Sequence, residues 1–222
     1  MISRQAKAFF YAANAPFMRL SAWIYKTFRA PRSGNTQSVK VQLGPGQKNY
    51  LEGWINVDAN FLTAKIDVWA DISNPLPFKN GSVDVFYSHH MIEHLPDLFF
   101  HFREMYRCLK PGGIIRVGGP NGDSAVKKFS DNELSWFGDF PDKRTSIGGR
   151  FENFIFCRRE HLTILTFSFL EEIATEAGFK NIVKCLPTQE TKHPEYITEA
   201  IFSKEWENDF EYPHTLLIEA EK

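Results

Sequence analysis

The chain alternates short apolar runs with longer amphipathic segments. Runs rich in β-branched and aromatic residues cover 39–43, 54–57, 66–70, 83–88 and 114–117, and two more, 182–186 and 215–220, follow toward the C-terminus. Each of the first four runs ends at a glycine or a polar residue. Strand-type runs that alternate with helical segments are typical of a parallel sheet with helices on both faces. The pattern therefore predicts an α/β fold built on a doubly wound sheet.

Two segments between these runs have helical periodicity. Residues 97–109 place Leu98, Phe102 and Met105 on one face, and the sequence KPGG at 110–113 stops the helix. Ser168 and Glu171 have the spacing of a capping box, which predicts a second helix through 177 that stops at Gly178.

The N-terminal part predicts an amphipathic helix that begins at Pro16 and closes at Ala30-Pro31. Its apolar stripe contains Phe17, Leu20, Ile24 and Phe28, and its opposite side carries Arg19, Lys26 and Arg29. One interpretation is a helix packed on the main domain as a lid or homodimer contact. The other is a helix that lies on anionic lipid, since such helices combine aromatic bulk with a cationic face. We expect residues 1–36 to form this basic extension and residues 37–222 to form the main domain.

Charge and cysteine usage narrow the function classes. Residues 1–51 carry eight Lys and Arg and no Asp or Glu, although the whole chain has a formal net charge of −1. This balance gives no global argument for nucleic-acid binding, and we expect no such partner. The three cysteines lack CxxC spacing, which argues against a zinc ribbon and a disulfide scaffold and favours the cytoplasm. No stretch approaches the ~18 consecutive apolar residues that span a bilayer.

Polar groups that follow the first three runs suggest a nucleoside site. Gly44 and Gly46 flank Pro45 in a turn that lets a ligand approach the backbone closely. The third glycine of a dinucleotide fingerprint is missing, and Asp58 comes only 14 residues after Gly44. Asp58 at the end of the second run can accept hydrogen bonds from a ribose diol, and Asp71 at the end of the third can accept one from adenine.

The order of these motifs resembles a known enzyme family. LGPG is followed by GWINVD, ADISNPLPFKNGSVDVFYSHHMIEHL, RCLKPGGIIRVGGPN and FLEEIATEAGF. This succession over about residues 39 to 182 is similar to the class I S-adenosylmethionine-dependent methyltransferases, closest to the type 11 branch. The resemblance implies a Rossmann-like, seven-stranded, mostly parallel sheet whose last strand is antiparallel. It also implies S-adenosyl-L-methionine as cofactor and methyl donor.

The resemblance also assigns site residues position by position. The cofactor-binding residues that it implies are Gly44, Pro45 and Gly46 at the methionine part, Asp58 and Ala59 at the ribose, Asp71 and Ile72 at the adenine, and Ser88 and His89 beneath the sulfonium. No metal ligand is expected.

Methyl transfer from a sulfonium needs chiefly alignment and exclusion of water. If the acceptor is an alcohol, a base helps, and His89, His90 and His94 follow the fourth run. We favour His89, because it follows the strand directly, whereas His94 fits a packing role. Two alternatives remain: a binding module without turnover, and a zinc hydrolase, since residues 90–94 fit the inverted zinc-protease pattern H-x-x-E-H.

The acceptor must be recognised by parts outside the shared core. An insertion at about residues 121–160 is far longer than the usual connection of ~2–6 residues and is rich in aromatic residues and arginines. These side chains suit either a clamp for a sugar, aromatic or anionic acceptor or a small core of their own. The acidic tail at 190–211 is interpreted as a solvated face. We expect a methyltransferase that acts on a small-molecule or glycan acceptor, at oxygen.

Overall fold

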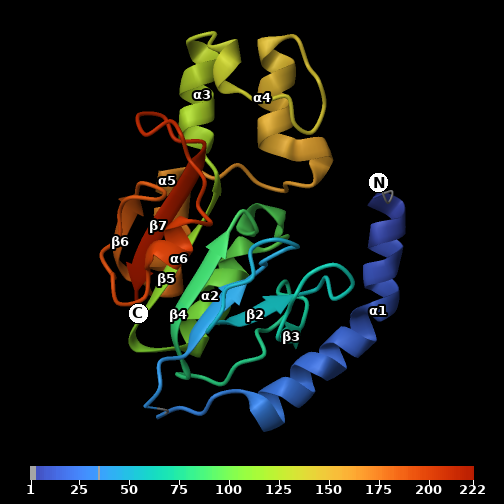
Figure 1. The fold of residues 1–222 in the computed structure, drawn as a ribbon, viewed down its shortest axis with the longest axis vertical. Helices are drawn as coiled ribbons and strands as arrows, with labels where there is room; N and C mark the ends of the chain where they lie inside the picture. Colours follow the sequence, from blue (N-terminus) through green and yellow to red (C-terminus); the bar gives the residue numbers. More distant parts are fainter. Residues whose placement is uncertain (1–3, 35) are drawn as a thin grey trace.

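Seven strands form a single sheet in the order β3-β2-β1-β4-β5-β7-β6 (Figure 1). The computed structural model describes residues 4–34 and 36–222. The strands are β1 (Lys40–Leu43), β2 (Ile55–Asp58), β3 (Val68–Trp69), β4 (Val83–His89), β5 (Leu109–Pro120), β6 (Lys180–Cys185) and β7 (Thr215–Glu221). β1 to β5 pair in parallel, and β7 runs antiparallel to both β5 and β6. The predicted mostly parallel sheet with an antiparallel last strand is confirmed.

The central strands are apolar because they are covered on both faces. Side chains alternate along β4, so Phe86 faces the main hydrophobic cluster while Val85 and Tyr87 face a second cluster on the opposite side. The main cluster lies under helices α2 (Leu98–Cys108) and α5 (Phe167–Ala177). The second cluster is closed by the segment that leads into α6 (Glu199–Phe202).

The two predicted helices are present, but one of them starts differently from the prediction. Asp97 caps α2 by accepting a hydrogen bond from the Phe100 amide at 2.9 Å. α5 is capped by Thr166 rather than by Ser168, so the capping-box prediction was wrong by two residues. Gly178 ends α5 with φ 105°, a conformation that favours glycine.

The acidic tail is a solvated face only in part, which corrects the interpretation from the sequence at Glu205 and Glu207. Glu205 is fully buried, and Glu207 is buried as well. Glu205 pairs with Arg116 of β5, and Glu207 accepts hydrogen bonds from the backbone amide of Thr215 and from nearby amides. The tail therefore folds back over the sheet and completes the second layer.

The segment at 121–160 projects beyond the sheet as a pair of helices (Figure 1). It contains α3 (Gly122–Ser130), the 3-10 helix η3 (Leu134–Trp136), α4 (Ile147–Phe156) and the 3-10 helix η4 (Cys157–Arg159). Trp136, Phe137 and Ile155 form a hydrophobic cluster within it, with Phe151 and Phe154 packed around them. Its arginines pair with acidic residues of the same segment, as Arg150 does with Asp139 at 2.8 Å. These aromatic residues therefore build a local core rather than a ligand clamp.

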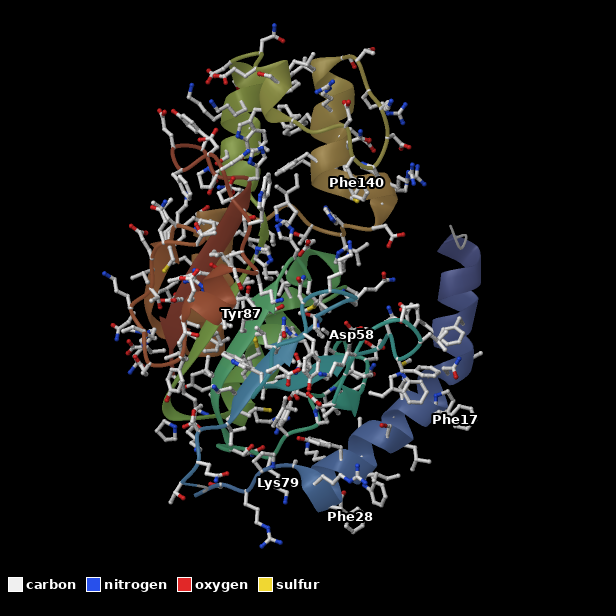
Figure 2. All side chains as sticks on the ribbon, viewed as in Figure 1. Phe17, Phe28, Asp58, Lys79, Tyr87 and Phe140 are labelled. Atoms are coloured by element: carbon white, nitrogen blue, oxygen red, sulfur yellow. The ribbon has the colours of Figure 1, made fainter. Side chains whose placement is uncertain are left out.

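The N-terminal helix is longer than predicted and packs by a different face. α1 spans Arg4–Ile24 with Pro16 inside it, and a π-helix, η1 (Tyr25–Arg29), continues it. Met18 is buried, whereas Phe17 and Phe28 are 62% and 74% exposed and point away from the sheet (Figure 2). The predicted apolar stripe thus faces outward. Among the described residues, no helix is long and apolar enough to cross a bilayer.

Candidate functional site

A crevice of about 480 Å³ opens where β1 and β4 end. It is lined by Gly44, Pro45, Gly46, Gln47, Lys48, Asn49, His89, His90, Lys204 and Trp206. A Cβ atom at Gly44 would lie 2.4 Å from Cγ of Met91, so this position has room only for glycine. A Cβ atom at Gly46 would meet no atom within 4 Å, so its backbone borders open space. The two predicted glycines, Gly44 and Gly46, therefore line the same cavity as His89.

Asp58 at the end of β2 holds the glycine turn in place. One carboxylate oxygen accepts a hydrogen bond from the Gly46 amide at 2.9 Å, and the other accepts one from the Asn60 amide at 2.8 Å. Each carboxylate oxygen can accept more than one hydrogen bond, so both retain capacity for a ligand hydroxyl. The predicted adjacency of Asp58 and the glycine turn is thereby present in the fold.

Asp71 lies elsewhere. Its carboxylate accepts hydrogen bonds from the Ser73 amide and hydroxyl and from the Asn74 side chain, at 2.6 to 2.9 Å. It borders a separate hollow of about 240 Å³ beneath α1, which Arg19 and Lys26 also line. The neighbouring Ile72 is buried in the main core. The crevice at the glycines and the hollow at Asp71 are thus two cavities rather than one.

Ala59 and Ser88 serve the scaffold around the crevice. The Ala59 carbonyl accepts a hydrogen bond from the Trp69 indole at 2.9 Å. The Ser88 hydroxyl is buried and donates to the Leu43 carbonyl at 3.2 Å, which ties the end of β4 to the end of β1. Both residues therefore fix the strand ends from which the neighbouring side chains project.

His89 presents an unused nitrogen at the crevice. Its ring stacks on Tyr87, and its buried Nε2 atom has no hydrogen-bond partner among the described residues. Burial lowers the pKa of His89 well below its usual value, and the neighbouring charges of His90 and Arg116 lower it further. The imidazole is therefore neutral at pH 7, with one nitrogen available to a ligand.

His90 and His94 do not share a helix. His90 has a left-handed backbone with φ 52°, and its Nε2 lies 3.0 Å from the Thr215 hydroxyl. His94 belongs to the short 3-10 helix η2 (Ile92–His94) and contacts the Glu160 carbonyl through Nδ1 at 2.8 Å. The inverted zinc-protease pattern requires a long helix through these residues, and the fold lacks it here.

Glu93 lies between these histidines and is buried. Burial by itself raises the pKa of Glu93, but the nearby His90 and His94 lower it, and the net shift is downward. Burial also lowers the pKa of His161, a residue that follows the insertion. Glu93 was not among the predicted site residues, although the H-x-x-E-H pattern contains it.

Several residues of the site were not predicted, among them Gln47, Lys48 and Asn49 beside the glycine turn. Lys204 and Trp206 reach the crevice from the tail, and only its folding back over the sheet brings them there. Burial raises the pKa of Tyr11 on α1, and the charges of Asp58, Glu160 and Asp71 raise it further. Local sequence carries no signal for such long-range contacts.

The sheet order and the glycine crevice together define the class I methyltransferase fold. Residues 36–117 match the family model of the type 11 methyltransferases, described as a methyltransferase domain. This part of the chain is therefore similar to a type 11 methyltransferase domain. No curated protein matches the chain significantly.

Solved methyltransferases share the fold at low sequence identity. An S-adenosylmethionine-dependent methyltransferase from Thermotoga maritima is 19% identical with a TM-score of 0.50, and the match covers 97% of this chain and 95% of that one. One from Archaeoglobus fulgidus is 16% identical with a TM-score of 0.51, covering 96% and 100%. Phosphoethanolamine N-methyltransferase 2 of Haemonchus contortus, solved with S-adenosyl-L-methionine, is 16% identical with a TM-score of 0.51, covering 90% and 56%.

The residues at the crevice fit this donor. Gly46 leaves open space beside its backbone, and the Asp58 carboxylate keeps acceptor capacity next to it. His89 lines the same cavity, and its buried Nε2 atom has no hydrogen-bond partner among the described residues. A buried polar atom without a partner costs free energy unless a ligand satisfies it.

Proposed function

We propose that the enzyme transfers a methyl group from S-adenosylmethionine to a hydroxyl oxygen of a small molecule or glycan. The observation that carries the proposal is the crevice that an Asp58-anchored glycine turn and His89 line together, His89 having a buried ring nitrogen without a hydrogen-bond partner among the described residues. In this arrangement, Gly44, Pro45 and Gly46 hold the methionine part of the donor, and Asp58 with Ala59 holds the ribose. Ser88 and His89 form the floor beneath the reacting centre.

We assign the adenine of the donor to Asp71 and Ile72. Oδ2 of Asp71 accepts one hydrogen bond from Asn74 and retains capacity for an amine donor. Arg19 and Lys26 border the hollow beside it, so α1 covers this end of the proposed donor site. Burial and the charges of Asp58 and Asp71 raise the pKa of Tyr11 on the same helix. We therefore propose that α1 also serves as a cover for the donor.

The donor supplies an activated methyl group, and the protein supplies alignment. In the step, the acceptor oxygen forms a bond to the methyl carbon as the carbon–sulfur bond breaks, and the acceptor proton leaves. Holding both partners in line and away from water lowers such barriers by up to ~7–11 kcal/mol. The neutral His89 imidazole, which lines the crevice, is the acceptor that we assign to this proton.

The crevice lining favours a hydroxyl over an ammonium-bearing acceptor. Lys48 and Lys204 border the cavity, and no carboxylate is among the residues that line it in the described part of the chain. Cationic walls repel a cationic acceptor and attract an anionic or neutral one. Trp206 is 71% exposed beside them and offers a flat apolar surface for a sugar ring.

Ligand-dependent melting tests the proposal directly. We expect S-adenosylmethionine and S-adenosylhomocysteine to raise the melting temperature in proportion to the logarithm of their concentration, because both bind only the folded chain. NAD serves as the matched control, since it shares the adenosine but not the sulfonium. Equal stabilisation by NAD, or none by either sulfur ligand, contradicts the proposed donor site. Donor binding without transfer to any hydroxyl acceptor favours a binding module.

Replacing His89 by alanine should slow the reaction without affecting donor binding. We expect kcat to fall by about 10²-fold, the low end for general-base catalysis, because a base with such a depressed pKa is weak. The affinity for S-adenosylhomocysteine should stay within a few-fold, since the glycines and Asp58 are untouched. His193→Ala, on the tail and absent from the crevice lining, is the control. Equal turnover in His89→Ala and the parent enzyme would show that His89 is not the base.

We also propose that the outward face of α1 rests on an anionic membrane surface. Phe17, Leu20, Trp23, Ile24 and Phe28 are all exposed on the helix and its π-helical continuation. The surrounding segment carries only positive charges, which complements anionic lipid. The enzyme would then be cytoplasmic and membrane-peripheral, and a homodimer contact through residues 16–30 is the competing outcome.

Vesicle cosedimentation distinguishes the two roles of the helix. We expect the parent protein to bind vesicles that contain phosphatidylserine and to lose most of this binding in the double variant Phe17→Ser/Phe28→Ser. Neutral phosphatidylcholine vesicles and the variant Val126→Ser, which changes an exposed apolar residue of α3, are the controls. A parent protein that sediments with neither vesicle and is dimeric by light scattering supports the homodimer contact instead.

A further inference from the structure

Glu93 is a buried carboxylate without a hydrogen-bond partner. Its side chain is 1% exposed, and neither of its oxygens has a hydrogen-bond partner among the described residues. An unsatisfied buried carboxylate is costly, so its environment must hold a compensating charge. Three histidines surround it: the distances to Oε1 are 3.5 Å from Nδ1 of His90, 3.8 Å from Nε2 of His94 and 3.9 Å from Nε2 of His161.

The other ring nitrogens of two of these histidines fix their tautomers. Nδ1 of His94 lies 2.8 Å from the Glu160 carbonyl, and Nδ1 of His161 lies 3.0 Å from the Ile155 carbonyl. A carbonyl oxygen only accepts, so each Nδ1 must carry the hydrogen and donate it. In the neutral imidazoles, both Nε2 atoms then present lone pairs toward the same carboxylate oxygen. In that state, three electron-rich atoms converge, and only a bound cation or an added proton offsets their mutual repulsion.

The spacing of these atoms suits a shared cation better than hydrogen bonds. Distances of 3.8 and 3.9 Å exceed the ~2.7–3.2 Å of an N–H···O hydrogen bond. The three ligand atoms lie within 4.8 Å of one another, so a cation at ~2.0–2.2 Å from each requires only a small closure of the side chains. Histidines that ligate metals characteristically donate the other ring N–H to a carbonyl or carboxylate, as both do here.

We propose that Glu93, His94 and His161 bind a divalent transition-metal ion such as Zn²⁺. Two neutral imidazoles and one carboxylate are a ligand set that zinc and its neighbours in the first transition row prefer over Mg²⁺. His94 is 41% exposed, which leaves one side of the ion open to water. The pair of histidines differs from the one that the H-x-x-E-H pattern suggests, because His161 takes the place of His90.

The backbone around the cluster is built to leave this space. A Cβ atom at Gly119 of β5 would lie 2.6 Å from Oε2 of Glu93, so glycine is needed for the carboxylate to fit. The Leu162 amide donates a hydrogen bond to the Glu93 carbonyl at 2.8 Å. This bond holds the segment that contains His161 against η2. The ion would thus link the segment that follows the insertion to the segment that follows β4. It would lie close to His90, which lines the crevice.

Metal binding can be measured without donor or acceptor, so its outcome is independent of the proposed methyl transfer. The full chain is stripped with a chelator and titrated with Zn²⁺ by calorimetry, with Mg²⁺ as the comparison ion. We expect one Zn²⁺ per chain and no comparable Mg²⁺ binding. Losing an outer-shell partner already costs ~10–100-fold in metal affinity, so His94→Gln and His161→Gln should each weaken Zn²⁺ binding at least tenfold.

His193→Gln is the matched control. Nδ1 of His193 lies 3.6 Å from Oε1 of Glu195, and Nε2 lies 3.6 Å from Oε1 of Glu221. The two carboxylates therefore lie on opposite sides of the ring, and among the described residues no second histidine completes a ligand set there. Zn²⁺ affinity should be unchanged in this variant, and S-adenosylhomocysteine affinity should be unchanged in all three. Absence of stoichiometric Zn²⁺ binding, or affinity that survives both ligand substitutions, overturns the proposal.

A spectroscopic readout keeps the test decisive if the variant of the partly buried His161 does not fold. Co²⁺ replaces Zn²⁺ in such sites and acquires visible absorption that depends on its ligands. We expect this absorption in the parent chain and its loss in His94→Gln, whose exposed side chain makes misfolding an improbable cause. A Co²⁺ spectrum identical in the parent and His94→Gln rules out His94 as a ligand and with it the proposed site.

Discussion

Arg116→Ala should destabilise the enzyme by about 3–5 kcal/mol, because it leaves two carboxylates buried and unpaired. Arg116 in β5 is fully buried and binds Glu205 through Nε at 2.6 Å and Nη2 at 2.7 Å. Its Nη1 binds Glu219 of β7 at 2.7 Å and the Glu190 carbonyl at 2.9 Å. Both carboxylates are fully buried, so no water replaces the lost guanidinium. One side chain thus joins two strands and the tail.

Urea unfolding at pH 7, followed by circular dichroism, measures this loss. The control is Arg103→Ala on the exposed side of α2, for which we expect a change within about 0.5 kcal/mol. Lys204 and Trp206 line the crevice from the same tail. We therefore expect Arg116→Ala to make these two residues mobile at lower urea concentrations than those that unfold the sheet. A free energy of unfolding equal to that of Arg103→Ala would show that the tail is held by its apolar contacts alone.

The strands were predictable because a strand that is buried on both faces is a short, nearly continuous run of apolar residues. The run at 83–88 is β4 almost residue for residue, and the run at 215–220 is β7. Adjacency of Asp58 and the glycine turn also followed from local order, since neighbouring parallel strands end at the same edge of the sheet. Each of these predictions needed only residues close in sequence and the rule for how such strands pair.

Helix boundaries were less predictable for a local reason. The sequence predicts a helix that begins at Pro16, because proline is common in the first turn, yet Pro16 lies inside α1 with helical residues on both sides. Thr166 and Ser168 both suit an N-cap, and only the hydrogen bond to the Phe169 amide decides between them. Sequence therefore predicted that these helices exist, but tertiary packing determines where they begin.

The contacts that define the site's chemistry join residues far apart in the chain. Arg116 meets Glu205 across 89 positions, and Thr215 meets His90 across 125. Glu93 and His161 likewise come together only when the insertion returns to the sheet. No local pattern distinguishes a glutamate that pairs in the core from one that faces solvent. The sequence therefore predicts solvent exposure for Glu205 and Glu207, which the fold buries. Such sites become visible only from the fold.

Asp58→Ala should reduce affinity for S-adenosylhomocysteine by at least about 10²-fold. If the carboxylate accepts both ribose hydroxyls, each hydrogen bond to a charged group contributes ~1.5–3 kcal/mol, and two such bonds reach this loss. The same carboxylate anchors the Gly46 amide at 2.9 Å, so the turn that faces the methionine part loses its support as well. Calorimetry with S-adenosylhomocysteine, which cannot turn over, measures the change.

Two further variants separate the ribose role from the support of the turn. Asp97→Ala removes a helix cap of α2 and controls for the loss of a single aspartate, so its affinity should match the parent. Asp71→Ala should weaken binding by less than Asp58→Ala, because adenine offers that carboxylate one hydrogen bond rather than two. An Asp58→Ala protein that folds yet binds within a few-fold of the parent would remove the ribose role. Since Asp58 is what joins the second strand to the glycine crevice, the donor would then have to lie elsewhere on this edge of the sheet.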